Sequence, residues 1–262
     1  MKNRFKWFIP LLLLIIIIIV YIWPVSKPSF EVLYADVDQE TAGSLVAFRE
    51  ANPLKTVVVE GKPWEYVVMG QGENTIVFLH GMTGAYDIWW QQMEGLQEKY
   101  RVIAMTYPAA GSLTEMAMGV MAIIDEVGID QVNLVGSSLG GYFAQYLVAN
   151  YPNRVKSAVF ANTFPPNDLI AEQNRVIGTL LPYLPEWLIM NVLSGSIRES
   201  VYPTAEYSEL VLAFGLEQTG GRMSKEQVIG RFHCVVDPFE APDPVALDIA
   251  VLIIESDNDP LV

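Results

Sequence analysis

The feature that most constrains the fold of this chain is a tight strand-to-helix turn centred on Ser138. An apolar run over residues 131–135 leads directly into Gly136-Ser137-Ser138-Leu139-Gly140-Gly141, and a run of helical character follows to residue 150. The pattern G-x-S-x-G in this context is typical of a turn so sharp that small residues must flank the serine. Backbone N–H groups at the start of the next helix favour developing negative charge. The pattern predicts that Ser138 is a nucleophile, with an ordinary glycine-rich turn as the alternative.

A second motif follows the apolar run at residues 75–79. It reads His80-Gly81-Met82-Thr83-Gly84, the form H-G-x-x-G, and it lies two strand-like runs before the serine motif. Glycines in such a loop let a backbone N–H approach a substrate oxygen. We therefore expect the N–H groups of Met82 and Leu139 to form an oxyanion hole.

Apolar strand-like runs alternate with helix-length segments through the first part of the chain. The predicted strands cover residues 75–79, 101–106, 131–135, 155–161 and 248–254, and the helices cover 88–99, 113–127 and 139–150. A hairpin is expected over 56–69. This alternation predicts an α/β fold with a mostly parallel, doubly wound sheet covered on both faces. It breaks after Asn162, where residues 165–245 indicate a helical cap insertion or, alternatively, an irregular continuation of the core.

Together these residues resemble the α/β-hydrolase superfamily over roughly residues 54–262. The H-G-x-x-G loop, the G-x-S-x-G elbow, the cap and a late strand ending in an acid occur in the family's order. A finer resemblance to maspardin-type members is carried by Gly136 to Gly141 and by Ala161-Asn162-Thr163-Phe164. The resemblance implies a hydrolase domain over residues 30–262 and a catalytic acid after the late strand. Asp259, in Asp259-Pro260-Leu261-Val262, matches the family's D-P-x-V pattern, with Asp257 as the second choice.

Two departures from the family pattern stand out. The loop over residues 106–112 lacks the acid that the family carries there. The family's histidine base follows the acid, yet the two histidines here, His80 and His233, both precede Asp259. In the family the residue equivalent to His80 is structural, and His233 is expected to be an ordinary cap residue, with a rerouted base as the alternative. The expectation is that the sequence is truncated, and that the base and a last helix and strand follow Val262.

The N-terminus predicts a membrane anchor. Lys2, Arg4 and Lys6 precede an uncharged run over residues 7–26, which as a helix would reach about 30 Å. An uncleaved signal anchor fits better than a cleaved signal peptide, because no A-x-A-like cleavage site follows. Residues 1–29 are therefore expected to be a transmembrane helix and stalk of a single-pass protein, with the N-terminus cytoplasmic and the hydrolase domain extracytoplasmic.

Charge and cysteine content exclude other classes. Residues 1–30 hold four of the 16 Lys and Arg residues and no acid, so the remainder carries 12 basic against 30 acidic residues, a net charge of −18. Such a surface disfavours nucleic-acid binding. Cys234 is the single cysteine, so no intrachain disulfide or cysteine-based zinc site can form. No P-loop, dinucleotide or zinc-protease motif occurs, and no cofactor or metal is expected.

The sequence thus predicts a membrane-anchored serine hydrolase, carboxylesterase- or lipase-like, acting on a small, hydrophobic acyl substrate. Ser138 would attack, Met82 and Leu139 would hold the oxyanion, and Asp259 would orient a histidine. Epoxide hydrolase and dehalogenase activities are disfavoured because those family members carry an acid where this chain has Ser138. The alternative is a non-catalytic binding or scaffold protein of the same fold, as the missing base and the maspardin-type resemblance suggest. The sequence makes no prediction of oligomeric state.

Overall fold

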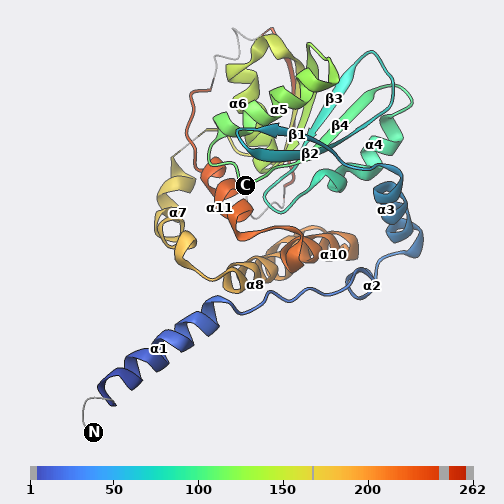
Figure 1. Cartoon of the computed structure of the whole chain (residues 1–262). Coiled ribbons are helices and arrows are strands. Elements are labelled where there is room, and N and C mark those ends of the chain that lie inside the picture. The colour runs from blue at the N-terminus through green and yellow to red at the C-terminus, as the bar shows by residue number, and fades with distance from the viewer. Residues whose placement is uncertain (1–4, 167, 242–247, 258–262) are drawn as a thin grey trace.

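A mostly parallel sheet forms the centre of the molecule. The computed structural model describes residues 5–166, 168–241 and 248–257. Across the sheet the order is β1-β2-β4-β3-β5-β6-β7. The β1–β2 and β2–β4 pairs are antiparallel, and the remaining pairs are parallel (Figure 1). The strands within the described ranges are β1 (Lys55–Val59), β2 (Lys62–Met69), β3 (Thr75–Leu79), β4 (Arg101–Thr106), β5 (Val132–Ser137), β6 (Val155–Ala161) and β7 (Ala250–Ile254).

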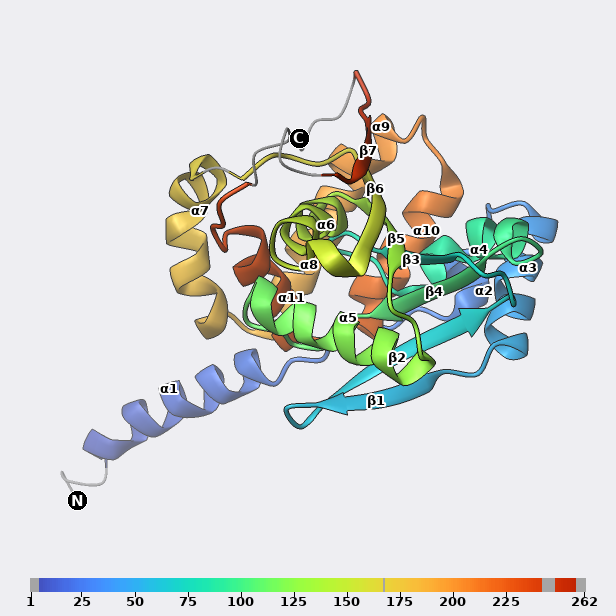
Figure 2. The same ribbon diagram turned by 90° about the horizontal axis from the view of Figure 1, so that it is seen from above.

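Helices cover both faces of the sheet, as the alternation predicts. Figure 2 shows α5 (Leu113–Val127) and α6 (Leu139–Asn150) on one side, and α3 (Gln39–Ala51) and α4 (Trp90–Leu96) on the other. Successive side chains of a strand point to opposite faces. In β3, Val77 and Leu79 accordingly join the apolar cluster under α5 and α6, whereas Phe78 joins the cluster under α3 and α4. Both faces of the central strands are therefore buried, which explains their continuous apolar runs.

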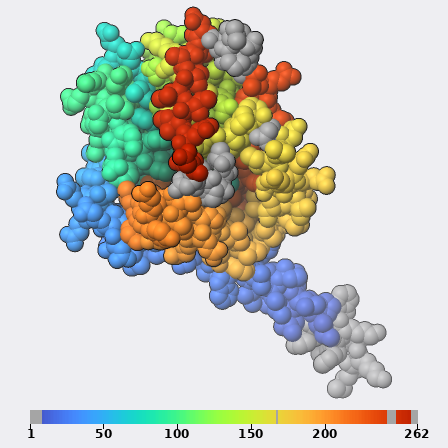
Figure 3. Space-filling view, turned by 180° about the vertical axis from the view of Figure 1, so that it is seen from behind, coloured from blue at the N-terminus to red at the C-terminus, as the bar shows by residue number. Residues whose placement is uncertain are grey.

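The chain between β6 and β7 is mostly helical where it is described. We call α7–α11, residues 169–235, the cap; it lies beneath the sheet in Figure 1. A π-helical turn at Ile197–Val201 and a kink within Gln218–Arg222, where Gly220 and Gly221 leave helical backbone angles, interrupt it. Figure 3 shows the cap's orange segment below the red segment that contains β7, whose residues are all exposed. The helices are α7 (Leu169–Leu180), α8 (Glu186–Ser196), α9 (Tyr202–Thr204), α10 (Glu209–Glu217) and α11 (Lys225–Val235).

The prediction of an N-terminal transmembrane helix is wrong. Helix α1 covers Phe5–Tyr21, which is 17 residues, and reaches about 25 Å against a hydrocarbon core of about 30 Å. Among the residues that the structure describes, no helix has both the length and the apolar character needed to cross a bilayer. The helix ends before Trp23-Pro24 because a residue preceding proline avoids helical backbone angles. The expected single-pass membrane location, with a cytoplasmic N-terminus and an extracytoplasmic domain, is overturned with it.

The segment after α1 runs along the cap. The Trp187 indole N–H donates to the Val20 carbonyl at 2.7 Å, and the Tyr21 hydroxyl donates to the Tyr183 carbonyl at 3.0 Å. Val25 packs against the apolar cluster inside the cap. The chain then forms the short helix α2 (Phe30–Leu33) and enters α3.

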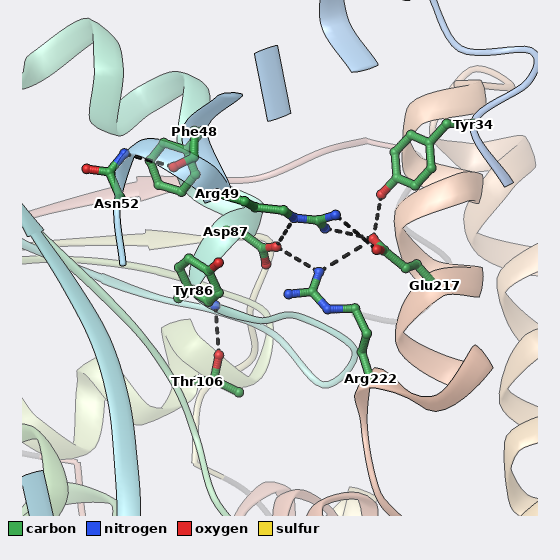
Figure 4. A network of polar contacts seen from close by, with 9 residues as sticks. All are labelled: Tyr34, Phe48, Arg49, Asn52, Tyr86, Asp87, Thr106, Glu217 and Arg222. Atoms are coloured by element: carbon green, nitrogen blue, oxygen red, sulfur yellow. Dashed lines mark hydrogen bonds and ion pairs between the residues drawn. The ribbon is translucent and has the colours of Figure 1, made fainter. Parts of the chain in front are cut away.

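A buried ion-pair network joins the cap to the rest of the molecule (Figure 4). Asp87, in the turn after β3, is fully buried and its Oδ2 accepts from Arg49 and from Arg222, both at 2.7 Å. Arg49 of α3 also donates to both carboxylate oxygens of Glu217 at the end of α10, at 3.0 and 2.7 Å. Burial alone would raise the pKa of Glu217, but the Arg49 hydrogen bonds and the Arg222 charge hold it below its usual value. The cap is thereby fixed to two segments distant in sequence.

His80 is a second buried polar group, between the sheet and the cap. Its Nδ1 lies 2.7 Å from the Gly81 carbonyl oxygen and its Nε2 accepts from the Tyr107 N–H at 3.3 Å. These partners place the ring proton on Nδ1. The ring stacks on Tyr107 with centroids 3.8 Å apart. Burial, helped by the Arg231 charge, lowers the pKa of His80 well below its usual value.

The buried network predicts a large cost for Asp87→Asn. Removing the charge of this fully buried carboxylate leaves Arg49 and Arg222 to share Glu217, so the free energy of unfolding should fall by about 3 kcal/mol. Asp125→Asn is the matched control, because the Asp125 side chain is 64% exposed in its pair with Arg154 and should cost less than about 1 kcal/mol. Urea unfolding followed by circular dichroism measures both. Equal losses for the two variants would contradict a structural role for the network.

The neutral state of His80 predicts a loss of stability in mild acid. The unfolded histidine takes up a proton below a pKa of about 6.5, whereas the folded one stays neutral, so the unfolded state binds more protons as the pH falls. The free energy of unfolding should therefore drop by about 1.4 kcal/mol between about pH 7.5 and about pH 5.5 through this residue. In His80→Asn that contribution should vanish. A variant that keeps the full pH dependence would show that other groups cause it.

Candidate active site

Ser138 stands alone between β5, which ends at Ser137, and α6, which begins at Leu139. Its backbone has φ 54° and ψ −123°, a conformation that costs a non-glycine residue about 1–3 kcal/mol and is found mainly at functional sites. The surrounding chain holds it there. The Ser138 N–H is directed at the carbonyls of Ala161 at 3.0 Å and Asn162 at 3.2 Å, and its own carbonyl accepts from the Thr163 hydroxyl at 2.8 Å.

The glycines around Ser138 are required by close backbone contacts. A Cβ at Gly136 would lie 2.2 Å from the Gly140 carbonyl oxygen, and one at Gly140 would lie 2.1 Å from the Leu79 carbonyl oxygen. No side chain fits at such distances, so helix α6 can approach β3 and β5 this closely only with glycine at both positions. The sequence motif is thus explained by packing.

The H-G-x-x-G loop lies directly against Ser138. A Cβ added at Gly81 would be 3.2 Å from Cβ and 3.7 Å from Oγ of Ser138. Met82 lines the same cavity as Ser138. Leu139 is the first residue of α6, so its N–H has no partner within the helix. The structure therefore brings the loop and the elbow together, as the oxyanion-hole prediction requires.

A cavity of about 380 Å³ opens over Ser138 between the core and the cap. Its lining comes from the H-G-x-x-G loop, the elbow, the turn after β3 and α4 on one side, and from α8 and the π-helical turn that follows it on the other. The lining residues are His80, Gly81, Met82, Thr83, Gly84, Ile88, Trp89, Gln92, Ser137, Ser138, Leu193, Ser196, Ile197 and Val201. The volume lies within the range of small-molecule sites.

Neither histidine is placed to activate Ser138. Both ring nitrogens of His80 are engaged by backbone groups, so this residue holds the loop. His233 is exposed on α11 and does not line the cavity. The predicted acid, Asp259, lies outside the described residues. Asp257, the second choice, is exposed beyond the end of β7.

The chain beyond β7 leaves the sheet next to the elbow. The Asn162 N–H donates to the Ile254 carbonyl at 2.8 Å, and the Asn162 carbonyl faces the Ser138 N–H. The carboxyl end of β7 is therefore on the same edge of the sheet as Ser138. That edge is where ligands bind in open α/β sheets.

Arg231 contacts the H-G-x-x-G loop beside Ser138, and no sequence motif predicts it. It is 2% exposed, and its Nη1 donates to the carbonyls of Met82 at 2.7 Å and Gly84 at 3.0 Å. Its Nη2 reaches the Tyr107 carbonyl at 3.5 Å, and burial lowers its pKa to about 10. Because the Met82 and Gly84 carbonyls accept hydrogen bonds from Arg231, this cap residue holds the H-G-x-x-G loop in position. No motif marks this arginine, since it lies in a cap helix without a recognisable pattern.

Comparison with known proteins agrees with this architecture. Residues 74–188 match the family described as alpha/beta hydrolase fold. Maspardin of Danio rerio is 34% identical over 160 residues, which cover 58% of this chain and 51% of maspardin. A dihydrolipoyllysine-residue acetyltransferase component of an acetoin cleaving system, from Cupriavidus necator, is 29% identical over 51% of this chain and 36% of its own length. The matches thus span about half or less of these curated relatives.

Solved structures share the fold at low sequence identity. The enol-lactonase from Burkholderia xenovorans LB400 superposes with a TM-score of 0.63 at 16% identity, over 79% of this chain and 93% of that one. A hydrolase from Pseudomonas aeruginosa gives a TM-score of 0.58 at 18% identity, over 79% and 91%. The matching family, the elbow, the loop and the sheet order together support an α/β-hydrolase superfamily member, with a weak further resemblance to maspardins.

Proposed function

We propose that this protein is a serine hydrolase that cleaves a neutral ester-like substrate with Ser138 as the nucleophile. The observation that carries the proposal is the backbone of Ser138, held at positive φ at the wall of a cavity and against the H-G-x-x-G loop. A fold keeps such a costly conformation where a side chain must be presented. Carboxylesterase-like chemistry is the form of hydrolysis that these groups favour.

In this mechanism the Ser138 hydroxyl oxygen attacks the ester carbonyl carbon and gives up its proton to a base. The carbonyl oxygen becomes negative and is held by the N–H groups of Met82 and Leu139. The bond to the alcohol then breaks, and water releases the acid from the serine. Asp259 is proposed to orient the base, which neither His80 nor His233 supplies from its position.

A non-catalytic binding role is the second candidate. The specific observation in its favour is that both ring nitrogens of His80 are engaged by backbone groups and that His233 does not line the cavity. A serine hydroxyl is a poor nucleophile without a positioned base. The maspardin resemblance adds to it. The two candidates differ in whether Ser138 reacts, which an activity-based probe reports directly.

A fluorophosphonate probe should label the wild-type protein, and Ser138→Ala should remove all labelling. Hydrolysis of p-nitrophenyl butyrate should fall by about 10⁴-fold or more in the same variant. Ser137→Ala is the matched control, since this neighbour ends β5 and is not held at the elbow, so it should still label. An unlabelled wild-type protein with a normal unfolding transition would favour the binding role instead.

Replacement of Arg231 should slow turnover more than it weakens substrate binding. Arg231→Met removes the donors that fix the loop carrying Met82, so kcat should fall by about 10- to 100-fold, as expected when an oxyanion donor is displaced. Arg231→Lys should recover little, because one ammonium group cannot reproduce the guanidinium fork. Steady-state kinetics on variants shown to be folded separate kcat from KM. A rise in KM with unchanged kcat would contradict this positioning role.

A further inference from the structure

A second cavity adjoins the one over Ser138. It has a volume of about 250 Å³ and lies between the turn after β3 and helix α10. Both cavities share Thr83, Ile88, Ile197 and Val201 as lining residues. The two spaces are therefore neighbours separated by a thin wall of side chains. The residues that line the second cavity alone are Trp90, Gln91, Leu210, Val211, Phe214 and Gly215.

Two of the four shared residues belong to a π-helical turn. Ile197 and Val201 are the first and last residues of that turn, which continues from α8. Such turns occur frequently at functional sites. Gly215 of α10 makes room for the wall, because a Cβ there would lie 3.0 Å from Cγ2 and 3.1 Å from Cδ1 of Ile197. The position of Ile197 thus depends on the absence of a side chain at Gly215.

Apolar side chains dominate the lining of both cavities. Ser137, Ser138 and Ser196 line the first cavity and not the second, and Trp90, Leu210 and Phe214 line the second and not the first. In the part of the chain that the structure describes, no Lys, Arg, Asp or Glu lines either space. This is notable in a protein of formal net charge −14. The arrangement suits a neutral ligand with one polar end at Ser138 and a long apolar end.

We propose that the second cavity receives the far end of an unbranched alkyl chain of a neutral ester whose carbonyl lies at Ser138. Ile197 and Val201 form the partition that the chain passes, and Gly215 sets its position. The ester assignment rests on the proposed function. The alkyl chain can belong to the acid or to the alcohol half of the ester, and the experiment separates these two sources.

Binding to Ser138→Ala protein tests the proposal without any turnover. Isothermal titration calorimetry would compare methyl octanoate and octyl acetate with methyl butyrate. Each buried methylene contributes about 0.8 kcal/mol, so the octyl or octanoyl ester that fits should bind about tenfold or more tightly than the short one. Which of the two long esters binds better identifies the half of the ester that enters the second cavity. Equal affinity for short and long esters would overturn the proposal.

Variants at the wall provide the second arm. Gly215→Ala, made in the Ser138→Ala protein, should push Ile197 into the space and reduce the preference for the long ester by several-fold, with little change for methyl butyrate. Ile197→Ala should open the partition and extend the preference to dodecanoate or dodecyl esters. Val192→Ala is the control, because Val192 is 63% exposed on α8 and lines neither cavity. A Gly215→Ala protein that loses affinity equally for short and long esters would contradict the proposal.

Failure of this inference can be told apart from failure of the proposed function. If affinity depends on chain length but the fluorophosphonate probe does not label the wild-type protein, the result supports the proposed role of the second cavity and contradicts the proposed hydrolase activity. If the probe labels the protein but affinity does not depend on chain length, the result supports the proposed hydrolase activity and contradicts the proposed role of the second cavity.

Discussion

The close approach of helix α6 to strands β3 and β5 is the constraint on which the site depends. At Gly140 the space for a Cβ is taken by the Leu79 carbonyl, only 2.1 Å away. Because the helix can begin so near the strand ends, Ser138 stands at the edge of the sheet with its first-turn N–H groups beside it. The same approach brings Gly81 within contact of the serine. Larger residues at these glycines would move the helix away and separate the two halves of the site.

The cap is attached to this core in two electrostatically different ways. At Asp87 two arginines share one buried carboxylate, with Glu217 completing the network. At Arg231 a buried guanidinium is held by backbone carbonyls, and no carboxylate lies within ion-pair distance of it among the described residues. The first arrangement fixes the cap to α3, and the second fixes the loop that carries Met82. Together they hold the cap in place over the core, and the two cavities lie between these parts. Ile88, which lines both cavities, is the neighbour of Asp87 in the chain.

The elements nearest the site were the most predictable from the sequence. The expected strands at 75–79, 101–106 and 155–161 match β3, β4 and β6. Strands buried on both faces are predictable because their sequences are continuous apolar runs. The N-terminal segment was wrongly predicted to be a transmembrane helix, because hydropathy reports how apolar a segment is and does not report the residue at which its helix ends. A transmembrane helix was expected to run to residue 26, whereas α1 stops at Tyr21. Asp259 as the acid stays a prediction, since it lies outside the described residues.

By itself the sequence determined the local chemistry: a serine between glycines, a glycine loop after a strand, and the alternation that builds a parallel sheet. These are encoded by neighbouring residues, because turns and buried strands depend on local backbone sterics and on continuous apolar character. Only the tertiary structure decided that Arg231 holds the Met82 loop, that His80 is locked by backbone partners, and that Gly215 makes room for Ile197. Such relations join residues far apart in sequence, and they follow from packing and desolvation, which no local pattern records.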